Sequence, residues 1–349
     1  MEQKSKNQYL DILQILRGIA ALMVVIHHTV GSLNYYHNIN NNVLNALGKF
    51  GKFGVDFFFI LSGFIISYAT YYKYKSPNNL QNYIKNRLIR VYIPYFPIGI
   101  TMYILYTYFP GFSNNQRDIS FLTTLTLLPN GNPALSVAWT LTFELFFYFV
   151  FAITFFSRKS WNYFVVIWTI VILLFNYTNL NTAVFSQNAI FRVFISTYNL
   201  EFIIGYLLSL LIIIYQIKIS LKQISIVIVL LFLAFLLPNF FSIITPYFYS
   251  NFLFSCFSFL MLYILINIYN KKVNQYSIMM FIGNASYSIY LIHNPLQMMI
   301  LRMYPKIKTN GSLILSIIIV LFLSCLFGYI YYLIFEKKCV SFLKSKILK

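Results

Sequence analysis

Long apolar runs, separated by short polar segments, follow one another along almost the whole chain. A transmembrane helix needs about 20 mostly apolar residues to cross roughly 30 Å of hydrocarbon, and about ten runs approach that length. The predicted spans are 12–33, 48–72, 88–109, 136–156, 161–177, 198–215, 223–238, 247–268, 278–301 and 311–335. This pattern predicts an all-α, polytopic bundle of about ten transmembrane helices.

The polar segments between these runs are too short to form a second domain. Residues 34–45 are rich in Asn, which favours turns over helix interiors, so a loop is predicted there. Residues 178–197 are expected to form an outer loop with room for a short interfacial helix. No internal repeat or long linker is evident, and the tail after the last run is too short to fold alone. We therefore expect residues 1–349 to form a single transmembrane domain.

The composition agrees with a membrane protein. Hydrophobic residues make up 59% of the chain and charged residues only 9%, whereas soluble domains are about 45–50% apolar and about 25% charged. So much apolar surface cannot be buried in one core, and a lipid bilayer is its natural solvent. The lysines ahead of the first run resemble a signal peptide, but Arg17 interrupts the run and no small-residue cleavage site follows, so we expect it to be retained.

The basic residues indicate how the helices are oriented. The net charge is +19, but the charges are scattered in short groups and form no sustained basic face, so nucleic acid is not an expected partner. With the N-terminus inside, eighteen Lys and Arg residues fall in cytoplasmic segments and seven in outer segments. The positive-inside rule therefore predicts that both termini are cytoplasmic. The three cysteines lack metal-ligand spacing, and no metal site is expected.

Several ionisable residues fall within the apolar runs or at their edges. A charged side chain at the centre of a bilayer costs at least about 2.5–3.5 kcal/mol, so each such residue needs a structural or functional reason. The residues concerned are Arg17, His27, His28, Asp56, Glu144, Glu201 and His293.

The first span carries the most informative pair. Arg17 and His28 are eleven residues apart, just over three helical turns, so they share one helix face with roughly 16 Å between them along the axis. His27 points about 100° away from His28. A lone buried His is often a structural core residue, but the shared face with Arg17 favours a functional His28.

The second and third spans add further candidates. Asp56 could neutralise Arg17 or a protonated His, or take part in function. Ser62 and Gly63 permit the close backbone approach that is common between membrane helices. Arg87 and Arg90 lie three residues apart on one helix side. They are either ordinary topology anchors or a clamp for phosphate groups, which guanidinium groups bind bidentately.

Two later spans contain polar groups. In the fourth span, Glu144 and Tyr148 are one turn apart and could hydrogen-bond to a common partner, five to nine residues after Trp139. The ninth span holds a polar patch with His293, and Pro295 is predicted to kink it. Packing and local hydrogen bonding are the first interpretation of this patch, with substrate contact as the second.

Taken together, these motifs resemble the acyltransferase 3 family of membrane acyltransferases. The first motif is Arg17 with ten residues before His28, which is the family's signature. The other matching pieces are Gly54-Val55-Asp56 running to Ser62-Gly63-Phe64, Arg87-x-x-Arg90-x-Tyr92-x-Pro94, Trp139 to Glu144 with Phe147-Tyr148, and Ser286-Tyr287-Ser288-Ile289-Tyr290-Leu291-x-His293-x-Pro295. Each is weak alone, but five in order along the chain are specific. The His27-His28 doublet departs from the pattern, and the spacing from Arg17 selects His28.

The resemblance implies transfer of an acyl group, usually acetyl from cytoplasmic acetyl-CoA, to a carbohydrate hydroxyl. It implies a bacterial cytoplasmic membrane and acceptors such as capsule, exopolysaccharide, O-antigen or peptidoglycan sugars, or a lipid-linked precursor. We expect the family's short form, without a periplasmic esterase-like domain. Membrane lipids, acyl-CoA and the carbohydrate acceptor are the expected partners.

The resemblance and the chemistry of the side chains suggest a role for each candidate. His28 deprotonates the acceptor hydroxyl, or accepts the acyl group and passes it on. Arg87 and Arg90, with Tyr92 and with help from Arg17, hold the donor. Asp56 or Glu144 orients His28. The expected acceptor contacts are Ser62, Trp139, Tyr148 and His293.

Two other classes of protein fit parts of the pattern. A proton-coupled secondary transporter or lipid-linked sugar flippase also places Arg, His, Asp and Glu inside the membrane, although such proteins often contain an internal repeat. A membrane sensor without catalytic activity would leave the spacing of Arg17 and His28 unexplained.

Overall fold

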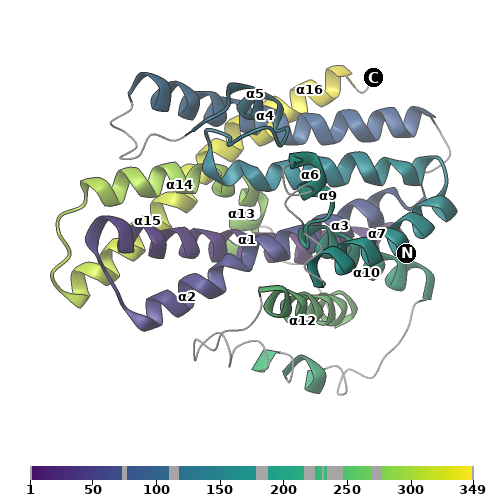
Figure 1. The fold of residues 1–349 in the computed structure, drawn as a ribbon, viewed down its shortest axis with the longest axis horizontal. Helices are drawn as coiled ribbons and strands as arrows, with labels where there is room; N and C mark the ends of the chain where they lie inside the picture. The colour runs from purple at the N-terminus through teal and green to yellow at the C-terminus, as the bar shows by residue number, and fades with distance from the viewer. Residues whose placement is uncertain are drawn as a thin grey trace. The chain divides into compact units, whose positions relative to one another are not determined.

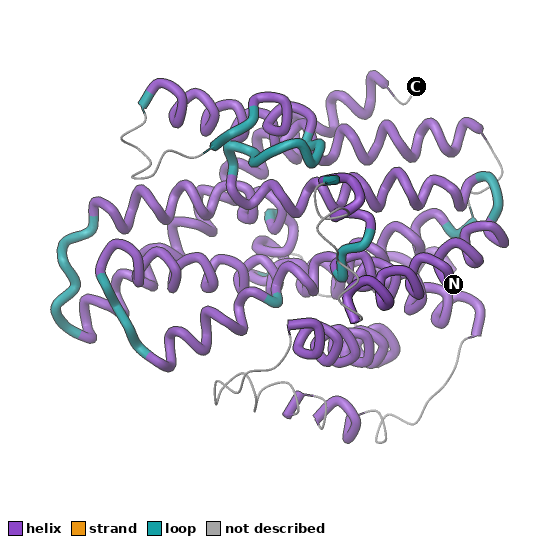
Figure 2. The backbone as a smooth tube through the Cα atoms, viewed as in Figure 1, coloured by secondary structure: helices purple, strands orange, loops and turns teal. Residues whose placement is uncertain are grey.

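The regular structure of the chain is helical. A computed structural model describes residues 2–72, 77–109, 118–177, 188–215, 225–229, 232–233, 247–268 and 277–347. In these residues every regular element is a helix, which confirms the predicted all-α class (Figures 1 and 2). The backbone divides into two compact units, Met1–Tyr68 with Ile204–Ile330, and Ala69–Ile203 with Tyr331–Lys349. They are called the first and the second unit below.

The first unit is built mainly from long helices. Its helices are α1 (Glu2–His37), α2 (Asn42–Lys52), α3 (Gly54–Thr70), α10 (Tyr198–Leu210), α12 (Tyr247–Ile268), α13 (Ile278–Asn284), α14 (Ser286–Met303) and α15 (Asn310–Tyr331). A π-helical segment, Leu211–Tyr215, continues α10. The ends of α3 and α15 and the start of α10 belong to the second unit.

The second unit contains the middle of the chain and its last helix. Its helices are α4 (Pro77–Tyr108), α5 (Phe121–Thr126), α6 (Trp139–Phe151), α7 (Arg158–Tyr177), α9 (Ala189–Phe194) and α16 (Val340–Ile347). Short 3₁₀ turns flank α6, at Ser136–Ala138 and Ala152–Phe155, and a π-helical segment, Tyr332–Cys339, precedes α16.

The helix lengths confirm a multi-pass membrane protein but not ten spans. Within the described residues, six helical stretches are long and apolar enough to cross a bilayer: 11–37, 42–70, 79–108, 136–155, 158–176 and 310–347. Two shorter apolar helices cover 198–214 and 250–266. The predicted span 223–238 lies largely outside the described residues. The predicted span 278–301 is divided at Ala285, where α13 ends and α14 begins.

The loop predicted for 34–45 is shorter than expected. α1 continues to His37 and α2 begins at Asn42. The side chain of Asn41 accepts hydrogen bonds from the backbone N–H groups of Val43 and Leu44. Asn therefore caps a new helix here, a role its short polar side chain fills as readily as a turn. The predicted loop 178–197 does carry a short helix, α9, in its described part.

Close backbone approach organises the first unit around α1. α1 contacts α2, α12, α13 and α14 (Figure 1). A Cβ atom at Gly18 would lie 2.9 Å from the backbone nitrogen of Gly283, and one at Gly54 would lie 2.5 Å from the Ala20 carbonyl oxygen. One at Gly51 would lie 2.9 Å from the backbone nitrogen of His27. Only glycine lets these backbones come so close, which maximises van der Waals contact between membrane helices.

Replacing Gly51 by Ala is therefore expected to destabilise the protein, because the new methyl group overlaps the backbone of α1. Overpacking of this kind costs about 1–3 kcal/mol. The thermal unfolding midpoint of purified protein in detergent should fall. Gly31→Ala in α1 is the control, since, apart from its own turn of helix, no atom of the described residues lies within 4 Å of a Cβ built at Gly31. Equal midpoints for the two variants would contradict this account of the packing.

Candidate functional site

Three histidines from two helices lie together in the first unit. α1 carries His27 and His28, and α14 carries His293. The ring centroids of His28 and His293 are 5.1 Å apart, and those of His27 and His28 are 5.0 Å apart. We call these three residues the histidine cluster. Its outer members, His27 and His293, are 266 positions apart in the chain, so the cluster exists only when α14 packs on α1.

Backbone carbonyls hold two of these rings and leave the third available. The Nδ1 atom of His27 lies 2.8 Å from the Gly48 carbonyl oxygen, and Nδ1 of His293 lies 2.7 Å from that of Tyr290. A carbonyl can only accept, so both Nδ1 atoms carry the proton. The ring of His28 makes no hydrogen bond to the described part of the protein. His28 is therefore the member free to exchange a proton with a substrate.

Two buried acceptors accompany the cluster on α14. Nε2 of His293 and Oε1 of Gln297 are buried and have no hydrogen-bond partner within the described residues. These residues are one helical turn apart, and the Gln297 amide donates to the Val25 carbonyl of α1 at 3.1 Å. A buried polar atom without a partner is costly. A ligand hydroxyl could donate a hydrogen bond to either acceptor.

Arg17 lies on α1 about three turns before His28, because the helix is continuous between them. Its Nη1 atom donates to Oε1 of Gln14 at 3.0 Å. α13 packs against this turn through Gly18 and Gly283. As predicted, one uninterrupted helix carries both Arg17 and His28. Arg17 is well separated from the histidine cluster.

Asp56 lies in the core of the first unit. Its side chain is only 1% exposed, and the amide of Asn251 on α12 donates to its carboxylate at 2.8 Å. Along the axis of α1, Gly51 lies beside His27 and Gly54 lies beside Ala20. From α2 into α3 the chain therefore runs towards the end of α1 that carries Arg17. This register places Asp56 beyond the level of Ala20, on the side away from His28. Its suggested role in orienting His28 gains no support from this position.

Ser62, the predicted acceptor contact on the same helix, is half-buried. Nearby, Gly205 of α10 packs so closely that a Cβ atom would lie 2.7 Å from the backbone nitrogen of Phe64. This turn of α3 therefore serves helix packing, as Gly63 suggested.

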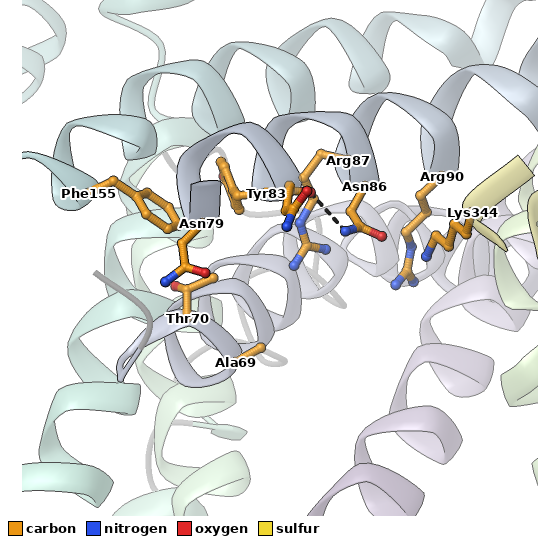
Figure 3. A pocket seen from close by; sticks show the side chains of 10 residues that line it. Ala69, Thr70, Asn79, Tyr83, Asn86, Arg87, Arg90, Phe155 and Lys344 are labelled. Carbon is orange, nitrogen blue, oxygen red and sulfur yellow. Dashed lines mark hydrogen bonds between the residues drawn. The ribbon is translucent and has the colours of Figure 1, made fainter. Parts of the chain in front are cut away.

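The second unit contains a cavity of about 500 Å³ along α4 (Figure 3). Among the described residues, its lining includes three cations, Arg87, Arg90 and Lys344, and no carboxylate. The other lining residues are Ala69, Thr70, Asn79, Asn82, Tyr83, Asn86 and Phe155. We call this cavity the cationic pocket.

The spacing of the α4 residues explains the polar wall of the pocket. Residues 79, 82, 83, 86, 87 and 90 recur every three or four positions, so they form one stripe along the helix. The Asn86 amide donates to the Asn82 carbonyl at 2.8 Å, which fixes its orientation (dashed in Figure 3). Within the described residues, Arg87, Arg90 and Lys344 form no ion pair. Unneutralised cations beside fixed amide groups are typical of a site for an anion.

Aromatic rings of α4 and α6 support Arg87. Its guanidinium carbon lies 5.7 Å from the ring centroid of Tyr83 and 5.4 Å from that of Tyr148, distances that suit cation–π contact. The Tyr83 hydroxyl donates to the Tyr148 carbonyl at 3.1 Å, and the Tyr148 hydroxyl donates to the Glu144 carboxylate. Glu144 and Tyr148 therefore interact with each other and support Arg87.

Two other predicted residues lie away from the cationic pocket lining. Tyr92 follows Arg90 by two residues, which places it on the opposite side of α4, and its hydroxyl donates to the Thr126 carbonyl at 2.5 Å. Trp139 begins α6 and packs against Tyr198, with ring centroids 5.2 Å apart. Within the second unit, these contacts hold α4 to the last residue of α5 and the start of α6 to the start of α10.

Comparison with known proteins identifies the family. A family model described as an acyltransferase domain matches residues 8–333. The chain belongs to the acyltransferase 3 family. No curated protein and no solved structure matches it. This acyltransferase 3 protein is thus an acyltransferase with several membrane helices, and the matched range includes the histidine cluster, Arg87 and Arg90. Lys344 lies beyond the end of that range.

Sequence reasoning missed part of both sites. Asn79, Asn82 and Asn86 share the helical spacing of Arg87 and Arg90, so a search for one polar stripe on this helix would have found them. Gln297 lies one turn after His293 and could have been found in the same way. Lys344 had no local signal, since only the fold brings α16 to the pocket.

The Asp56–Asn251 hydrogen bond yields a stability test. Asn251→Ala is expected to lower the unfolding free energy by about 1–3 kcal/mol, because it removes a donor from a buried carboxylate. A double-mutant cycle with Asp56→Asn, followed by thermal unfolding, should give a coupling energy of about 1 kcal/mol. Strictly additive effects would show that the pair contributes no interaction of its own.

Proposed function

We propose that the protein is an O-acetyltransferase that moves acetyl from cytoplasmic acetyl-CoA to a hydroxyl of a surface polysaccharide or of its lipid-linked precursor. The observation that carries the proposal is the cationic pocket, together with family membership. Its volume falls within the range of about 300–1,000 Å³ that is usual for ligand sites. The bacterial cytoplasmic membrane is the proposed location.

The donor is assigned to the cationic pocket because coenzyme A carries several phosphate groups. Arg87 and Arg90 lie on the same side of α4 and have no ion-pair partner in the described chain. Guanidinium groups bind phosphate oxygens in bidentate fashion. The neighbouring amides of Asn79 and Asn82 add neutral donors and acceptors for the nucleotide. Glu144, Tyr148 and Tyr83 serve the donor indirectly by supporting Arg87.

The chemical step is assigned to His28. Its imidazole takes the proton of the acceptor hydroxyl while the hydroxyl oxygen attacks the thioester carbonyl carbon. The carbon–sulfur bond then breaks, coenzyme A leaves as the thiolate, and the proton held on His28 is returned to that sulfur. An acetyl-imidazole intermediate on His28 is the alternative route. The free ring of His28 between two rings with fixed protons supports this assignment.

His293 and Gln297 are proposed to position the acceptor and His28. The unpartnered Nε2 of His293 can accept from the N–H of a neutral His28, which leaves the other nitrogen of His28 as the base. Oε1 of Gln297 can accept from an acceptor hydroxyl. Ser62 and Trp139 are proposed as further contacts of the acceptor, and Arg17 as a further contact of the donor.

Substitution of His28 tests the activity. The wild type, His28→Ala and His27→Ala should be expressed in a host that makes the polysaccharide, with membrane levels checked by immunoblot. O-acetyl groups are then measured by NMR. The wild type should add acetyl esters, and His28→Ala should add at least about 100-fold fewer, since general base catalysis contributes about 10²–10⁴-fold. His27→Ala should retain transfer, because the Gly48 carbonyl already holds that ring.

Two outcomes would overturn these assignments. Equal acetylation by the wild type and His28→Ala would remove His28 from the reaction. The second outcome is that the wild type adds no acetyl groups while deletion of its gene keeps the polymer from the cell surface; in that case the protein acts as a transporter or flippase.

A second test concerns His293. Gln places an acceptor oxygen close to the position of Nε2, whereas Leu fills a similar volume without one. His293→Leu is expected to lower kcat about 100-fold with KM for acetyl-CoA little changed. His293→Gln should keep kcat within about tenfold of the wild type. Equal loss in both variants at equal unfolding midpoints would show that the acceptor atom is not what matters.

A further inference from the structure

α16 brings one more cation to the cationic pocket. Lys344 lines the cavity together with Arg87 and Arg90 of α4 (Figure 3). α16 and the π-helical segment before it both contact α4. At the start of this segment, the Tyr331 hydroxyl donates to the Pro94 carbonyl of α4 at 2.6 Å. These contacts hold α16, and with it the backbone of Lys344, against α4.

The surroundings of Lys344 differ from those of an ordinary surface lysine. Lys344 is half-buried and has no ion-pair partner within the described residues, although two other cations line the same cavity. Like charges at such a place repel one another and lower the stability of the empty site. A bound anion would turn that repulsion into attraction.

Lys346 shows the ordinary behaviour on the same helix. It is exposed, and its ammonium group lies 4.5 Å from the ring centroid of Phe342. Lysines at the end of a membrane helix commonly place the charge in water in this way. Helix orientation by positive charge thus accounts for Lys346 but does not explain why Lys344 points into a cavity.

We propose that Lys344 is a phosphate-binding residue, so that α16 completes a three-cation site with Arg87 and Arg90. This inference rests on the proposed function when the phosphate belongs to coenzyme A. An anionic phospholipid headgroup offers the same chemistry, and the experiment separates the two sources. Lys344 lies outside the stretch that matches the family, which ends at residue 333.

The test compares Lys344→Gln with Lys346→Gln in purified full-length protein. Binding of coenzyme A and of inorganic pyrophosphate is measured by calorimetry in detergent and in nanodiscs of zwitterionic lipid. Loss of one charge-assisted contact is expected to weaken coenzyme A binding about tenfold. In this variant, coenzyme A binding should also depend less steeply on salt concentration. Lys346→Gln should bind as the wild type does. Circular dichroism and unfolding midpoints establish that both variants are folded.

The outcomes distinguish this inference from the proposed function. If Lys344→Gln weakens pyrophosphate binding and wild type does not bind coenzyme A, the phosphate site stands and the proposed donor is wrong. If the variant binds coenzyme A normally but retains less anionic phospholipid than Lys346→Gln on purification, the phosphate is a lipid headgroup. If the variant matches the wild type for coenzyme A, pyrophosphate and anionic lipid, Lys344 is not a phosphate-binding residue.

Discussion

The first unit depends on the close approach of other backbones to α1. Gly18, Gly51 and Gly54 lie where any side chain would overlap a neighbouring backbone. In a bilayer there is no hydrophobic force between apolar helices, so association relies on van der Waals contact and on hydrogen bonds between them. The same approach brings the Gly48 carbonyl within reach of His27 and the Gln297 amide within reach of the Val25 carbonyl. The packing of neighbouring helices on α1 therefore also positions the polar groups beside the histidine cluster.

In the proposed reaction, each of the two units contributes one of the two sites. The histidine cluster belongs to the first unit and the cationic pocket to the second. Each unit is assembled from two separate stretches of chain, because the backbone leaves the first unit at residue 68 and returns to it at residue 204. Neither unit can be cut out as a continuous fragment. Each site therefore becomes complete only after both stretches of chain that form its unit have been made.

The sequence predicted features that depend on local spacing better than features that depend on distant contacts. The helix that carries Arg17 and His28 was predictable, because helical periodicity and the cost of intramembrane charge both act locally. The apolar runs predicted the membrane class, whereas six of the described helical stretches are long enough to cross a bilayer. A run of apolar residues does not show where a helix breaks, as at Ala285. The partner of Asp56 and the third cation of the cationic pocket were not predictable, because Asn251 and Lys344 come from distant helices.

The separation of His28 and His293 along the chain has a consequence for biosynthesis. A ribosome that has delivered α1 to the membrane must still add more than 250 residues before α14 can pack beside it. During that interval His28 has no partner ring from α14. Under the proposed mechanism, an incomplete chain therefore lacks the arrangement that activates a hydroxyl or water against a thioester, and nascent protein would not hydrolyse acyl-CoA.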